Sequence, residues 1–83
     1  MESEWDIKVF PNPSSGDFVF EFLNISQEKI NVNIYDAIGK MILSDEVNDS
    51  QFTIHNAQLK AGIYSAVISN GELKKIIRLV KTN

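Results

Sequence analysis

Segment 10–16, Phe-Pro-Asn-Pro-Ser-Ser-Gly, restricts the fold more than any other stretch, because it holds both prolines of the chain. Proline lacks a backbone N–H and fixes φ, so Pro11 and Pro13 exclude a helix and a central strand here. Asn12 precedes a proline and therefore favours extended or polyproline geometry. The two serines can close local turns, and Gly16 can adopt a positive φ at little cost. We expect a rigid corner that ends one strand and allows another to begin.

Apolar and polar residues alternate along most of the chain, as they do in half-buried strands. The first clear case places three phenylalanines, at positions 18, 20 and 22, on one face. Similar inward rows are expected at 30, 32 and 34, at 52 and 54, and at 64, 66 and 68. The pattern predicts strands at 7–10, 17–23, 29–35, 40–44, 51–55, 63–69 and about 72–81.

Polar or glycine-containing turns separate the predicted strands. A polar turn is expected at 24–28, an acidic loop at 45–50 and a connector at 56–62. Gly39 is expected to take a positive φ in the tight connection 36–39, and Asn70-Gly71 is typical of a type I′ hairpin. Seven short strands without a clear helix predict an all-β fold, an antiparallel β-sandwich.

A further pattern, Leu59-Lys60-Ala61-Gly62-Ile63-Tyr64, favours a Greek-key sandwich. Its spacing is typical of a tyrosine corner, in which a tyrosine hydroxyl bonds the backbone a few residues upstream. The alternative is that Tyr64 is an ordinary strand aromatic.

Length and composition limit the remaining choices. Eighty-three residues form one small domain, 7–83, with 1–6 as a lead-in, and the chain has no cysteine for disulfides or thiolate metal ligands. A net charge of −3 argues against nucleic acid as a partner. No apolar run approaches the length of about 20 residues that a membrane-spanning helix needs. The acidic start at 1–4 is unlike a signal peptide, so the chain is either cytosolic or, as we expect, a fragment of a longer precursor.

The residues needed for catalysis or for a cofactor are not arranged in any known pattern. His55 is the single histidine and no G-x-S-x-G motif accompanies it, so we expect a solvated side chain there. The acidic residues of 45–50 lack calcium-loop spacing, and the four glycines are scattered among turns. We therefore predict a domain that is not an enzyme and has no cofactor. A structural or carbohydrate-binding module remains an alternative, although the aromatics fit a core better and Trp5 has no assigned place.

Basic residues gather at the end of the chain. Lys74, Lys75, Arg78 and Lys81 are four of the eight lysines and arginines. They can protect an edge strand from aggregation, or they can offer a basic strand to an acidic receptor. The adjacent Ile76 and Ile77 must lie on opposite sides of this strand, so it is either buried on both faces or exposes one apolar row.

Four segments together resemble one protein family. They are 9–16 with its P-N-P-x-x-G pattern, Val-Asn-Ile-Tyr-Asp-Ala-Ile-Gly-Lys at 32–40, the L-x-x-G-x-Y pattern at 59–64, and the basic apolar strand at 75–81. Their order and spacing are similar to the type A C-terminal sorting domain of the type IX secretion system of Bacteroidota. The resemblance covers about residues 7–81.

The resemblance implies an immunoglobulin-like sandwich at the C-terminus of a secreted precursor. Such a domain directs folded cargo from the periplasm through an outer-membrane translocon to the cell surface or the medium, and a C-terminal signal peptidase usually removes it. The implied partners are the translocon or its shuttle, the peptidase and the preceding cargo, with the domain itself a monomer. The motif residues carried over are Pro11, Asn12, Pro13, Gly16, Tyr35, Asp36, Gly39, Lys40, Gly62, Tyr64, Lys74, Lys75, Arg78 and Lys81.

Overall fold

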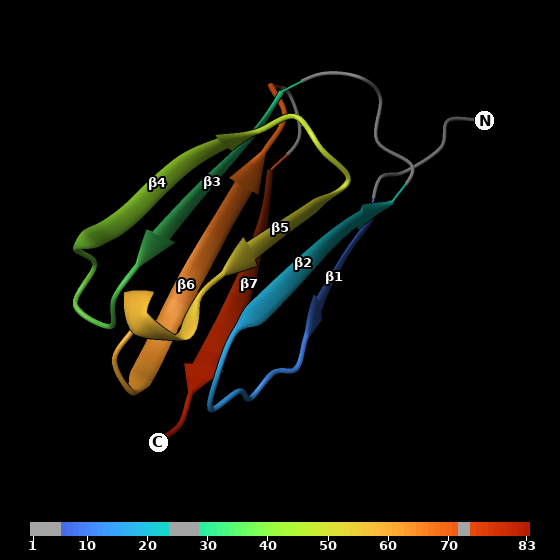
Figure 1. The fold of residues 1–83 in the computed structure, drawn as a ribbon. Coiled ribbons are helices and arrows are strands. Elements are labelled where there is room, and N and C mark those ends of the chain that lie inside the picture. The colour runs from blue at the N-terminus through green and yellow to red at the C-terminus, as the bar shows by residue number, and fades with distance from the viewer. Residues whose placement is uncertain (1–5, 24–28, 72–73) are drawn as a thin grey trace.

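The chain forms two antiparallel sheets that pack face to face (Figure 1). The computed structural model describes residues 6–23, 29–71 and 74–83. Their elements are β1 (Asp6–Phe10), β2 (Phe18–Leu23), β3 (Ile30–Tyr35), β4 (Met41–Val47), β5 (Gln51–Ile54), the 3-10 turn η1 (Asn56–Gln58), β6 (Gly62–Ser69) and β7 (Lys74–Lys81).

The strand order is that of an immunoglobulin-like sandwich. One sheet runs β1-β2-β5 and the other runs β4-β3-β6-β7. These orders correspond to strands A, B and E facing strands C′, C, F and G of that fold. The tyrosine corner lies where this fold places it, at the start of β6, where the Tyr64 hydroxyl donates to the Lys60 carbonyl at 2.6 Å. The predicted fold class and the predicted corner are both confirmed.

The core lies between the two sheets and is made from the rows that alternation predicted. Phe20 is completely buried, and its ring lies 6.5 Å from that of Phe22 and 6.0 Å from that of Phe52. Phe52 itself is half-buried against the cluster. Across the gap, β3 contributes residues 30, 32 and 34, β6 contributes 64, 66 and 68, and β7 contributes Leu79. The inward assignment of these rows is confirmed.

The expected acidic loop at 45–50 is wrong over its first half. β4 continues through Asp45 and Glu46 to Val47. Val47 is buried and pairs with Ile30, so the apolar contact at the end of the ladder extends the strand. The acidic residues are tolerated because β4 is an edge strand, and Glu46 lies 3.9 Å from Lys29.

Two glycines have the positive φ that the sequence predicted, although the two-residue hairpin expected at Asn70-Gly71 is wrong, because Ser69 pairs with Lys74. Gly39 and Gly71 have φ of +92° and +103°, whereas Gly16 has no positive φ. In the corner the turn is closed by Ser14 instead, whose hydroxyl donates to the Asp17 carbonyl at 2.7 Å and accepts from the Gly16 N–H at 3.0 Å. The expectations for Trp5, for the turn at 24–28 and for a strand start at Glu72 lie outside the described residues.

Candidate functional site

The first motif lies against the last strand of the molecule. Both X–Pro bonds in it are cis, and Pro11 and Pro13 are exposed. The side-chain amide of Asn12, between them, donates to the Arg78 carbonyl at 2.8 Å and accepts from the Val80 N–H at 3.0 Å. We call this pair of bonds the Asn12 clasp.

The backbone at Ser14 continues the same contact. Ser14 N–H donates to the Val80 carbonyl at 3.0 Å, and Thr82 N–H donates to the Ser14 carbonyl at 2.8 Å, which forms a parallel bridge between Ser14 and Lys81. In a parallel ladder the residue two positions earlier would bond to the Arg78 carbonyl and the Val80 N–H. The side chain of Asn12 makes those two bonds in place of its backbone. The clasp therefore extends the ladder by one further rung.

Lys81 differs from the expectation that it belongs to an exposed basic strand. It is buried, with 6% of its surface exposed, and faces inward. Its ammonium donates to the Leu59 carbonyl at 2.7 Å and the Asn56 carbonyl at 3.2 Å. Because side chains alternate along a strand, the position that continues the row of Ile77 and Leu79 must also point toward the core. Lys81 thus joins the end of β7 to the segment before the tyrosine corner.

The second motif is a turn stabilised by Asp36. One carboxylate oxygen of Asp36 accepts from the Ile38 N–H at 3.1 Å and the Lys40 N–H at 2.9 Å. The Asp36 N–H donates to the Lys40 carbonyl at 2.9 Å, and its own carbonyl accepts from the Gly39 N–H at 3.0 Å. The turn therefore uses the side chain of Asp36 in the way expected of an Asx turn.

The second and third motifs border one surface hollow. Its volume is about 260 Å³ and its walls are residues 36–38 and 61–64. Gly62 begins β6 at this hollow and pairs with Lys81 across the sheet. Tyr35 pairs with Ser65, which in turn pairs with Arg78, so a motif residue of β3 and one of β7 lie in one row across β6.

The terminal strand exposes one face and buries the other. Lys74, Ile76 and Arg78 point outward, and Ile76 is 67% exposed. Leu79 is completely buried, and Lys75 and Ile77 are partly buried on the same inner side. Of the two arrangements left open by the sequence, β7 has the second, an edge strand with one exposed face.

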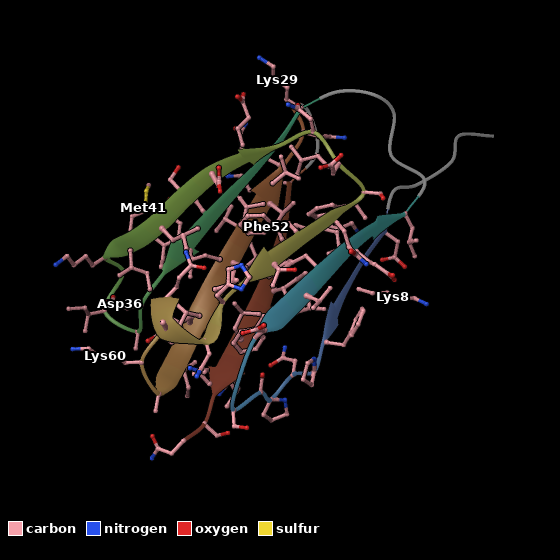
Figure 2. All side chains as sticks on the ribbon, in the orientation of Figure 1. Lys8, Lys29, Asp36, Met41, Phe52 and Lys60 are labelled. Atoms are coloured by element: carbon pink, nitrogen blue, oxygen red, sulfur yellow. The ribbon has the colours of Figure 1, made fainter. Side chains whose placement is uncertain are left out.

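The first three motifs and the C-terminal part of the fourth therefore meet at one end of the sandwich, whereas β7 begins at the other end, where Lys74 pairs with Ser69. Figure 2 shows Asp36 and Lys60 at the end where the corner 11–16 and the C-terminus also lie. β1 begins at the opposite end, where Asp6 pairs with Leu23, and runs toward the corner. We call the end that carries the first three motifs and the C-terminal part of β7 the motif end.

The described residues offer no candidate metal-binding cluster. No group of three or more His, Cys, Asp or Glu side chains within 6–23, 29–71 and 74–83 is placed to hold a metal ion. His55 is exposed as expected and lies 3.9 Å from Asp17. Within the same ranges, no helix has the length and apolar character to cross a membrane.

Comparison with known families shows to which family this chain belongs. Residues 8–82 match the model of the family described as the secretion system C-terminal sorting domain. The chain belongs to this family. Its members are the sorting domains of the type IX system, so the resemblance seen in the four motifs is confirmed. A sorting domain is a signal rather than a catalyst, which agrees with the prediction of a non-enzymatic chain.

A relative of this chain is a much longer protein. The chain is 42% identical over 60 residues to an endo-acting ulvan lyase of Formosa agariphila. The matched region covers 71% of this chain and 11% of the lyase, so the chain spans about a tenth of the relative's length. A type IX sorting domain implies export of the protein that carries it, to the cell surface or beyond.

Two residues at the motif end were not predicted as site residues. Ser14 is 96% buried and closes the corner while bridging to β7. Asp17 accepts from the Asn56 N–H at 2.7 Å and so ties the corner to η1. The run of Pro and Ser at 13–15 indicated a local turn, but only the tertiary fold brings that turn to the last strand.

Proposed function

We propose that this domain is a cleavable export signal, which directs a folded cargo preceding β1 across the outer membrane by the type IX system. Membership in the sorting-domain family over residues 8–82 carries the proposal. The cargo passes through the periplasm and reaches the surface or the medium. During this export the domain acts as a single unit, residues 7–83, and as a monomer.

The geometry supports recognition at the motif end. A cargo joined ahead of β1 attaches at the opposite end, so it leaves the motif end free for the translocon or its shuttle. We assign the partner-facing role to exposed motif residues, namely Pro11, Pro13, Lys40 and Arg78 toward this end and Lys74 at the start of β7. The buried members, Tyr64 and Lys81, act by holding this end in shape.

An export assay tests the function. Residues 7–83 are fused behind a reporter that carries a periplasmic export signal, in a bacterium with an active type IX system. We expect the reporter at the surface or in the medium, and in the periplasm of a translocon-deficient strain. A matched control fusion ends at residue 71 and lacks β7. Retention of the full fusion in the periplasm of the competent strain would refute the proposal.

Removal of the domain is tested on the same exported reporter. Mass spectrometry of the secreted product is expected to show loss of most of residues 7–83, through the C-terminal signal peptidase. An exported product that keeps β7 in a peptidase-positive strain would mean that the signal is not removed. The length of the ulvan lyase supports a cargo far larger than the domain itself.

A further inference from the structure

One side of β7 is open over the first half of the strand. β7 is the last strand of its sheet, and it pairs with β6 without a register shift from Lys74–Ser69 to Lys81–Gly62. In an antiparallel ladder, the N–H and C=O of a residue point to the same side, and the sides alternate. Val80 directs both groups away from β6, to Asn12 and Ser14.

By the same alternation, the main-chain groups of Lys74 and Ile76 and the N–H of Arg78 also point away from β6. The corner 12–14 covers this side from the Arg78 carbonyl onward. Among the described residues, no strand lies against the preceding part of β7. The molecule itself thus uses one half of this edge as a strand acceptor and leaves the other half open.

The side chains beside the open edge combine positive charge with one apolar position. Lys74 and Arg78 are exposed and form no ion pair within the described residues. Ile76 lies between them and is 67% exposed, with the half-buried Val67 as its cross-strand neighbour. β6 and β7 contain no Asp or Glu, although the whole chain carries a net charge of −3. The open edge is therefore a local cationic strip on an acidic protein.

Protection from aggregation accounts for only part of this pattern. Lysine on an edge strand discourages pairing with other sheets, and Lys74 fits that use. A highly exposed isoleucine at the centre of an unpaired edge has the opposite effect, because it favours pairing with an apolar side chain. The exposure of Ile76 is explained if this edge binds a specific strand of a partner, whose apolar side chain would cover it.

We infer that residues 74–78 of β7 accept an extended acidic segment of a partner protein as an added strand. Main-chain bonds to the open edge hold the segment. Its carboxylates lie opposite Lys74 and Arg78, and an apolar side chain lies opposite Ile76. A basic segment does not bind, because its positive charges would lie opposite those of Lys74 and Arg78. The clasp at Arg78 marks where the added strand must end. This inference rests on the proposed function, in which the partner belongs to the secretion machinery.

Amide hydrogen exchange on the full 83-residue chain tests the added strand directly. The probe is a synthetic peptide that alternates valine and glutamate, and the control peptide has lysine in place of glutamate. The acidic peptide is expected to slow exchange at Ile76 and Arg78 by about tenfold or more. Lys75 and Ile77 direct their N–H groups toward β6, so their exchange should not change. Unchanged exchange at millimolar acidic peptide, or equal protection by the lysine peptide, overturns the inference.

Two variants separate strand addition from general charge effects. Arg78→Glu reverses the outward charge and should weaken binding of the acidic peptide about tenfold. Ile76→Pro removes an N–H from the open side, where proline is tolerated, and should abolish protection at Arg78. Lys8→Glu makes the same charge reversal on β1, another edge strand, where Lys8 points into solvent (Figure 2). Equal weakening by Lys8→Glu would mean that net charge alone governs binding.

The export assay tells failure of this inference apart from failure of the sorting function. With the wild-type domain and Lys8→Glu, the reporter should leave the cell, and with Arg78→Glu export should fall about tenfold. If the wild-type fusion stays in the periplasm, the sorting function itself is refuted. If the wild-type and Arg78→Glu fusions leave equally well, the sorting function stands and the added strand is refuted.

Discussion

Asn12 shows why one residue type suits the centre of the first motif. The ladder on β7 continues past Ser14 through the side chain of Asn12 in place of its backbone. That side chain must donate to the Arg78 carbonyl and accept from the Val80 N–H at once. A carboxamide carries both groups at one end, whereas a carboxylate carries only acceptors. Geometry and chemistry together select asparagine.

Asn12→Ala should lower the free energy of unfolding by about 1–2 kcal/mol, because it removes two hydrogen bonds. Asn12→Asp should cost at least as much at neutral pH, since an anionic oxygen then faces the Arg78 carbonyl. Urea unfolding followed by circular dichroism measures both. Asn48→Ala, in the exposed turn after β4, is the matched control and should change stability by less than about 0.5 kcal/mol. Equal effects at positions 12 and 48 would contradict the clasp.

Lys81 should act through stability rather than through exposed charge. Lys81→Met keeps the apolar stem but leaves the Leu59 and Asn56 carbonyls without their donor, at a cost of about 1–3 kcal/mol. Lys74→Met makes the same substitution at an exposed position of the same strand and should cost less than about 0.5 kcal/mol. Urea unfolding compares the two. A Lys81→Met protein as stable as wild type would contradict the inward role.

At the scale of elements, the sequence was most informative where alternation was strict. The inward rows of β2, β3 and β6 could be assigned because apolar and polar residues alternate strictly there, which indicates a strand with one face toward the core. β4 was assigned too short, since Asp45 and Glu46 resemble a loop in sequence and are strand residues only through pairing with β3. Lys81 and Asn12 could not be placed, because their partners lie 22 and 68 residues away in the chain. Contacts this distant leave no local pattern.

The turn between β3 and β4 provides a prediction at this scale. Gly39→Ala should destabilise the domain by about 1–2 kcal/mol, because φ of +92° disfavours a side chain even in open space. Gly16→Ala is the matched control: it has no positive φ and no atom within 4 Å of a new Cβ. It should be neutral, or stabilising by up to about 1 kcal/mol, through loss of unfolded-state freedom. Thermal unfolding of the two variants in the opposite order would contradict the turn geometry.

For the whole molecule, one thin core supports every feature of the motif end. Chains of this length have a free energy of unfolding of about 4–12 kcal/mol. The clasp on β7, the Lys81 bonds and the hollow at 36–38 each join segments that only the closed sandwich brings together. A signal built in this way is presented by the folded domain and lost on unfolding. Core mutations far from the motif end should therefore abolish export.

Phe20→Ala tests this dependence. Phe20 is completely buried between the sheets, so its truncation should cost about 3–5 kcal/mol, which is a large share of the stability of a chain this small. Thermal unfolding by circular dichroism should show a large fall in the midpoint, and the reporter fused to this variant should remain in the periplasm. Phe10→Ala, at a ring that is 43% exposed, should leave far more of the stability. Efficient export of a Phe20→Ala domain shown to be unfolded would mean that the machinery reads the last residues as a linear peptide. Retention, with export by the Phe10 variant, would mean that it reads the folded motif end.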